Sequence, residues 1–385
     1  MKTLLIKNVG LMLSGEVEHP LLDADSILVE QGVIRRVGSA LAPPDDDTRV
    51  IDAAGCAVTP GLIDSHCHVV LGDWTPRQQM QNFLESSVHG GVTTSISAGE
   101  VHLPGRPKDA LGAKCLAILA AGSWASHRPG GMKVLGGALI LEKGLTESDI
   151  DECARAGVRV VGEVGLGSVK DPDEAAQMVA WAKARGMIVM MHTGGTSIPG
   201  SSVVGADQIL RVKPSVVSHI NGGPTAVSLE GAMEIIEKSD AALEIVQCGN
   251  SKRAVQVADI IHERGEWGRC ILGNDAPSGT GVITLGLLRN IAMLAGQSAV
   301  PPELAMGMAT GNTAKLYGFN RGRIAEGLEA DLVVMDAPIG SPGGNTLEAL
   351  SEGDIPGISI VMVDGAVVVN KSRNTPPPVR QARVV

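Results

Sequence analysis

Residues 158–193 read VRVVGEVGLGSVKDPDEAAQMVAWAKARGMIVMMHT, and this stretch predicts a strand, a helix and a second strand. Short apolar runs at 158–165 and 186–193 flank a segment, 171–186, in which apolar residues recur at helical spacing. That segment starts with Asp and ends with Gly, which is typical of a capped helix. Two apolar strands separated by a helix predict parallel strands joined by a crossover.

The same alternation continues over about residues 60–319. Further amphipathic segments at 228–239 and 250–266 follow apolar runs in the same way. Near-continuous apolar strands are typical of a parallel sheet that is covered on both faces. Eight such runs alternating with helices over ~250 residues predict an α/β fold of the (β/α)8 TIM barrel type. The runs are GLID (61–64), TTSISAG (93–99), KVLGGALIL (133–141), VRVVGEVG (158–165), GMIVMMHT (186–193), SVVSHI (215–220), AALEIVQ (241–247) and RCILGND (269–275).

The two flanking segments, residues 1–59 and 320–385, have a different pattern. Both contain short runs of Val and Ile separated by Gly, Pro and Asp, which predict strands. Neither segment alone has enough strands to bury one face of a sheet. We therefore expect both ends of the chain to form one small composite β-sandwich domain beside a barrel domain at 60–319.

Composition excludes several classes of function. The chain has 385 residues, a formal net charge of -10 and 2% aromatic residues. An acidic chain without a basic run offers no electrostatic footprint for nucleic acid or a membrane surface, and few aromatics leave no stacking platform for bases. Six scattered cysteines and the lack of an apolar run of ~18 residues predict a reduced, cytoplasmic protein. We expect a small-molecule substrate and a homo-oligomer, either a dimer or a tetramer.

Metal-ligand residues lie at the carboxyl ends of the predicted strands, where (β/α)8 barrels carry their active sites. Because side chains alternate along a strand, His66 and His68 point to one side and Cys67 points to the other. A lone His-x-His also arises by chance, but four more ligands at the ends of other strands favour a metal site. One ion needs three or four protein ligands, so a larger set with a carboxylate able to bridge predicts two ions. The full set is His66, His68, Glu163, His192, His219 and Asp275.

Several motifs together resemble the amidohydrolase superfamily, and the resemblance extends over essentially the whole chain. They are PGLIDSHCH (60–68), the lone strand-end residues His192 and His219, GND (273–275), ATGNTAKLYGF (309–319) and GRIAEGLEADLVVMD (322–336).

This resemblance implies specific roles for the six residues. His66, His68 and Asp275 would hold one ion, and His192 and His219 would hold the second. Many members bridge the two ions with a carbamylated lysine. Here Glu163 occupies the strand-four position, whereas the nearest downstream lysine, Lys170, lies in the loop beyond Gly165 and Gly167. We therefore expect a glutamate bridge.

The implied cofactors are two divalent ions per chain, zinc and/or iron, with manganese also compatible with imidazole and carboxylate ligands. Two cations that share a water lower its pKa and supply hydroxide to attack a polarised carbonyl. Asp275 is the predicted proton shuttle to the leaving nitrogen, and a role as ligand alone also fits it. The resemblance implies opening of a small cyclic amide, with 6-oxo-1,4,5,6-tetrahydronicotinate converted to 2-formylglutarate and ammonia in nicotinate degradation.

Other functions remain open at this point. The alternatives are a dihydroorotase-like cyclic amidase, an adenine-type deaminase, and a non-enzymatic assembly protein on the same fold. Cations in the predicted strand-end loops could orient a substrate carboxylate, although ordinary surface charge explains each of them as well. The substrate-binding candidates are His127, Arg128, Arg106, Lys133, Thr193 and Asn221.

Overall fold

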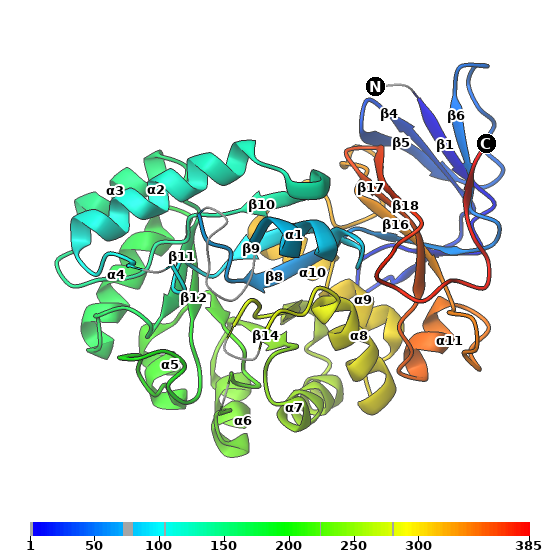
Figure 1. The fold of residues 1–385 in the computed structure, drawn as a ribbon. Coiled ribbons are helices and arrows are strands. Elements are labelled where there is room, and N and C mark those ends of the chain that lie inside the picture. Colours follow the sequence, from blue (N-terminus) through cyan, green and yellow to red (C-terminus); the bar gives the residue numbers. More distant parts are fainter. Residues whose placement is uncertain (1–2, 72–79, 104, 224, 279–280) are drawn as a thin grey trace.

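A ring of parallel strands surrounded by helices forms the larger part of the molecule (Figure 1). The computed structural model describes residues 3–71, 80–103, 105–223, 225–278 and 281–385. Within these residues eight parallel strands form two ladders, in the orders β10-β9-β8 and β11-β12-β13-β14-β15. Isolated parallel bridges, Leu139 with Val161 and Cys67 with Ala276, connect the two ladders and close the ring. The strands are β8 (Leu62–Cys67), β9 (Val92–Ser97), β10 (Lys133–Leu135), β11 (Val160–Val164), β12 (Ile188–Met191), β13 (Val216–Val217), β14 (Ala242–Val246) and β15 (Cys270–Gly273).

A helix follows each strand of the ring, so the predicted (β/α)8 barrel is present. Three helices begin directly after the polar residue that starts each predicted segment, because Asp171, Ser228 and Asn250 accept hydrogen bonds from backbone N–H groups of the first turn. Among the described residues every helix is too short or too polar to cross a lipid bilayer. The helices of the barrel are α1 (Met80–Val88), α2 (Ala110–Ser126), α3 (Glu147–Arg155), α4 (Pro172–Ala184), α5 (Ala206–Val212), α6 (Leu229–Lys238), α7 (Ser251–Arg264) and α8 (Gly286–Gln297), followed by α9 (Pro302–Met308) and α10 (Gly311–Tyr317).

The third strand is shorter than the apolar run that predicts it. β10 ends at Leu135, and parallel pairing resumes only at Leu139. Two glycines interrupt it: a Cβ on Gly136 would lie 2.2 Å from the Trp124 side chain, and one on Gly137 would lie 2.3 Å from a backbone carbonyl oxygen of α2. The strand breaks here because α2 packs directly against its backbone.

Apolar side chains fill the barrel below the carboxyl ends of its strands. One buried cluster takes residues from all eight strand segments of the ring and closes with Tyr317 and Phe319, at and just after the end of α10. Such a packed interior leaves the strand ends as the face that can hold a site. Residues of this cluster in or next to the strands are Ile63, Ile96, Ala98, Ala138, Val160, Met190, Val216, Ala242 and Ile271.

Strands from both ends of the chain form two further sheets beside the barrel, visible as blue and red ribbons side by side in Figure 1. One sheet has the order β19-β6-β1-β4-β5 and the other β18-β17-β16-β7-β2-β3. A buried apolar cluster draws residues from both sheets. The strands are β1 (Leu4–Lys7), β2 (Leu11–Leu13), β3 (Leu21–Leu22), β4 (Ser26–Glu30), β5 (Val33–Gly38), β6 (Arg49–Asp52), β7 (Ala57–Pro60), β16 (Leu332–Asp336), β17 (Gly357–Val363), β18 (Ala366–Asn370) and β19 (Arg383–Val384), and a short helix, α11 (Thr346–Ser351), follows β16.

Candidate metal centre

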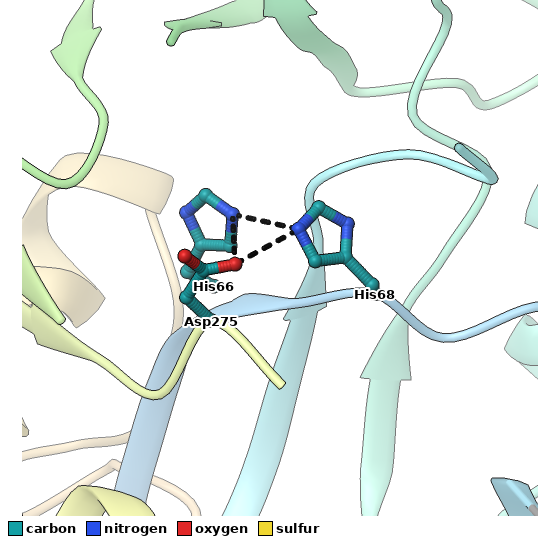
Figure 2. A group of neighbouring side chains, drawn as sticks. All are labelled: His66, His68 and Asp275. Carbon is teal, nitrogen blue, oxygen red and sulfur yellow. Dashed lines mark hydrogen bonds and ion pairs between the residues drawn. The ribbon is translucent and has the colours of Figure 1, made fainter. Parts of the chain in front are cut away.

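The first group of ligand side chains joins the end of β8 to the segment after β15. Figure 2 shows His66, His68 and Asp275 pointing toward one another. The His66 and His68 Nε2 atoms are 3.3 Å apart, and Asp275 Oδ1 lies 3.0 Å from His68 Nε2 and 3.6 Å from His66 Nε2. All three residues are buried. This set, called the β8 group below, can hold one metal ion.

A second group, Glu163, His192 and His219, lies at the ends of β11, β12 and β13. Glu163 Oε1 is 2.6 Å from His219 Nε2 and 3.8 Å from His192 Nδ1. The two imidazole nitrogens lie 3.2 Å apart. This buried set, called the β11 group, can hold a second ion.

Glu163 lies between the two groups. Its Oε1 faces the β11 group, while its Oε2 is 3.6 Å from His66 Nε2 and 3.6 Å from His68 Nε2. One carboxylate therefore offers one oxygen to each group, as a bridging ligand requires. Lys170 lies elsewhere, with its ammonium donating to the Gly165 carbonyl at 3.3 Å.

Hydrogen bonds outside the two groups determine which ring nitrogen of two imidazoles faces the cluster. His66 Nδ1 lies 2.7 Å from Glu244 Oε2, and His192 Nε2 lies 2.7 Å from the Gly195 carbonyl oxygen. Because both partners only accept, we assign the ring proton to the nitrogen that faces each of them. A neutral imidazole has one N–H, so the other nitrogen presents a lone pair to the cluster. This leaves His66 Nε2 and His192 Nδ1 as ligand atoms.

The electrostatics of the cluster favour positive charge. Burial raises the pKa of Glu163, but the imidazoles of His66 and His219 outweigh it and hold that pKa well below its usual range. At Asp275 burial also raises the pKa, but the imidazole of His66 outweighs this effect and the pKa is lowered. At His66 burial lowers the pKa, yet Glu244 and Glu163 raise it well above the ordinary value. The carboxylates therefore stabilise a cation, which protons or metal ions can supply.

Two of the ligand residues have strained backbones. Asp275 has φ 58° and His219 has φ 34°, in the left-handed region that glycine favours. Each such residue costs about 1–3 kcal/mol, and strain of this kind concentrates at functional sites. The surrounding structure holds both side chains in the cluster against that cost.

Two adjoining cavities open above the cluster. The inner cavity, of about 260 Å³, is lined by ligand residues of both groups and by His102, Ser197 and Ser278. An outer cavity of about 600 Å³ shares four lining residues with it, among them His102. Lys108 and Lys170 line the outer cavity, so its wall is cationic in a chain of net charge -10.

A sequence model of the amidohydrolase family matches residues 57–368. The chain belongs to this family. Enamidase of Eubacterium barkeri is 55% identical over 386 residues and covers 100% of both chains. A crystal structure of enamidase, at 55% identity, covers 100% of both chains with a TM-score of 0.97. The 5-methylthioadenosine/S-adenosylhomocysteine deaminase of Halobacterium salinarum is 25% identical over 84% of this chain and 83% of its own.

Three predicted substrate-binding residues of this amidohydrolase lie at the opposite end of the barrel. His127 directly follows α2, and Arg128 pairs with Asp364 at 2.6 Å. Lys133 begins β10, with its ammonium 2.6 Å from the same carboxylate. The expectation that these residues face the cleft is wrong, because their loop leads into a strand and lies at its amino end.

Two other candidates, Thr193 and Asn221, have contacts within the protein. Thr193 Oγ1 donates to the carbonyl oxygens of Ser218 and His219, and the Asn221 amide bonds to both backbone groups of Val246 at 2.9 Å. Both side chains are fully buried. They hold the loops that carry the ligands, in place of the predicted substrate contact.

Arg106 is the one substrate candidate that the structure places at a cavity next to the cluster. It lines the outer cavity. Its guanidinium forms a buried ion pair with Glu142 at 2.7 Å. This pairing neutralises the charge that we expected to attract a carboxylate.

Two buried acids next to the ligands were not predicted. Glu244 lies within β14 and Asp64 within β8, and both side chains are buried. Asp64 accepts from the backbone N–H groups of His66 and Asn274, and burial raises its pKa to about 6. The signal was available in the sequence, because a charged residue inside an apolar strand is rarely buried without a partner.

Proposed function

We propose that the chain hydrolyses 6-oxo-1,4,5,6-tetrahydronicotinate to 2-formylglutarate and ammonia in nicotinate degradation. Family membership makes it a hydrolase that acts on carbon–nitrogen bonds. The observation that carries the specific proposal is the full-length similarity to enamidase, together with the six ligand-type side chains gathered at the strand ends. Two waters are consumed, one to open the ring amide and one to release ammonia from the enamine.

We infer that the β8 group and the β11 group each hold one divalent ion, with Glu163 common to both. The residues fit such ions: within each group ring nitrogens face one another, and one imidazole of each group, His66 or His192, has an outer hydrogen bond that leaves its lone pair toward the cluster. Imidazole and carboxylate ligands suit zinc, iron and manganese. When bound, such ions supply a water of lowered pKa and polarise the amide carbonyl.

Asp275 is the proposed proton carrier. It lines the inner cavity and remains ionised near neutral pH, because its pKa is lowered by the neighbouring imidazoles against the effect of burial. An ionised carboxylate can accept a proton from the attacking water and return it to the ring nitrogen as the amide bond breaks. Without that proton the nitrogen would leave as a poorly stabilised anion.

The cavities support an anionic substrate of this size. The inner cavity of about 260 Å³ can enclose a single substituted ring. The cationic wall formed by Lys108 and Lys170 would attract the ring carboxylate toward the site.

The decisive test is product analysis with protein purified without chelators. The 6-oxo-1,4,5,6-tetrahydronicotinate ring should open with release of ammonia. The deaminase relative supports a second candidate, which would release ammonia from an aminated heterocycle and leave the ring intact. Protein without metal and without activity on lactams, cyclic ureides or aminated heterocycles would instead favour an assembly role.

Three further properties belong to the proposal. Residues 1–59 and 320–385 form one composite β-sandwich domain attached to a barrel domain at 60–319, which the shared buried cluster supports. The chain assembles into a dimer or tetramer, and it acts in the cytoplasm. Size-exclusion chromatography with light scattering tests the assembly.

A further inference from the structure

Glu244 lies inside the barrel, directly beneath the ligand groups. It is in β14, two residues after Ala242, which belongs to the apolar cluster of the barrel interior. Because alternate strand residues share a face, Glu244 also points into the interior. Its side chain is 0% exposed. A carboxylate in such a place needs partners that offset the loss of water.

The partners of Glu244 come from both ligand groups. Its Oε2 accepts from His66 Nδ1 at 2.7 Å and from the backbone N–H of His219 at 3.3 Å. Its Oε1 accepts from Ser65 Oγ at 2.6 Å. One carboxylate therefore contacts a ligand ring of the β8 group and the backbone of a β11-group ligand.

We propose that Glu244 is a positioning residue for the metal centre. It keeps the proton of His66 on Nδ1, which leaves Nε2 free as a ligand, and it fixes the plane of the ring. It also adds a buried negative charge: two divalent ions bring four positive charges, whereas Glu163 and Asp275 together bring two negative ones. Uncompensated buried charge is costly, so Glu244 stabilises the loaded centre. This inference rests on the proposed metal centre.

The two groups should depend on Glu244 unequally. In the β8 group it bonds to the ring of His66, whereas in the β11 group it reaches only the backbone of His219. His192 has its ring nitrogen fixed by the neutral carbonyl of Gly195 instead. Loss of Glu244 should therefore weaken the β8 site more than the β11 site.

The test is zinc(II) affinity of metal-free protein, measured by competition with a chromophoric chelator. Glu244→Gln removes the charge, and Glu244→Asp keeps the charge but withdraws it from His66. Each should weaken one of two zinc sites about 10–100-fold, the range found for partners of metal ligands. Both variants disturb buried hydrogen bonds of Glu244 and should also lower the thermal stability of the metal-free protein. The diagnostic readout is therefore the unequal loss of affinity at the two zinc sites, which a purely structural role would not produce.

Asn290→Ala is the matched control. Asn290 is a fully buried residue of α8 whose amide donates to the carbonyl oxygens of Ile245 and Gly273 and to no ligand side chain. This change should destabilise metal-free and zinc-loaded protein alike and leave zinc affinity unchanged.

Different outcomes would overturn the role of Glu244 alone or the proposed metal centre together with it. Two tight zinc sites in the wild type and unchanged affinity in either folded Glu244 variant would overturn the role of Glu244 alone. A wild type that binds no zinc, iron or manganese would overturn the metal centre and the inference together. If Glu244→Gln does not fold, Glu244→Asp decides the question.

Discussion

The two ends of the barrel each contain a cluster of carboxylates, but only one end supplies its own cation. At the amino end the ammonium of Lys133 lies 2.6–2.9 Å from carboxylate oxygens of Glu329, Asp331 and Asp364. At the carboxyl end no lysine or arginine of the described residues forms an ion pair with the β8 or β11 group. The two acidic clusters can thus serve different purposes. The cluster at the amino end contains its own cation, Lys133, and joins the barrel to the flanking sheets, whereas the cluster at the carboxyl end can bind cations from solution.

Removing the ligands of the β8 group tests most directly whether the cluster at the carboxyl end holds metal. His66→Ala combined with His68→Ala should abolish one metal site and lower kcat by roughly 10⁴-fold or more, because the activated water is lost. Metal analysis by mass spectrometry and ammonia release measure both effects. Full metal content with full activity would contradict the assignment.

Glu163→Gln tests the bridge. It retains the shape of the side chain but removes the charge that faces both groups, so the protein should lose most of both metals and its activity with them. Lys170→Ala is the control and should retain its metal, because that ammonium contacts the Gly165 carbonyl and no ligand. Bicarbonate-dependent activity, with metal lost from Lys170→Ala, would point to a carbamylated lysine instead.

Asp275→Asn separates proton transfer from metal binding. The amide can still offer an oxygen to a metal but cannot accept a proton, so kcat should fall by about 10²–10⁴-fold while much of the metal stays bound. Steady-state kinetics on metal-quantified protein provides the measurement. Near-normal kcat would leave Asp275 as a ligand only.

Lys133→Met tests the other half of the comparison. It leaves the buried Asp331 carboxylate without its closest cation, which should cost about 3–5 kcal/mol in the free energy of unfolding, measured in urea. Metal content should stay normal. As a control, Arg155→Met breaks an exposed pair with Asp151 and should leave the free energy of unfolding nearly unchanged. Metal loss in Lys133→Met would show that the two clusters are not separate in function.

The smallest expected effect concerns the outer cavity. Replacing Lys108 and Lys170 together by alanine should raise KM roughly tenfold at low salt, because the attraction for an anionic substrate is lost. The difference from wild type should shrink at 1 M salt, where the Debye length is about 3 Å. A difference that does not change with ionic strength would argue against an electrostatic role.

The barrel and the clustering of six side chains could be predicted from sequence because both follow from local rules. Strand ends of a parallel barrel meet at one face, so residues as distant as His68 and Asp275 are brought together by topology alone. The substrate candidates at 127–133 directly precede the predicted strand at 133–141, so the direction of that strand already places them at its amino end, away from the ligands. The partners of Glu244 and Lys133 depend on side-chain packing between distant segments, which residue spacing does not reveal.

The β8 group lies where the ring of strands closes, so it links the two ends of the barrel. The first and last barrel strands meet through a single isolated bridge, Cys67 with Ala276, and the ligands of this group stand on both sides of that seam. If an ion binds there as proposed, it would link two segments 207 residues apart, and opening of the barrel would then require release of the ion. Because Asp275 follows the eighth strand, the β8 group would have its full set of ligands for an ion only after that strand has been synthesised.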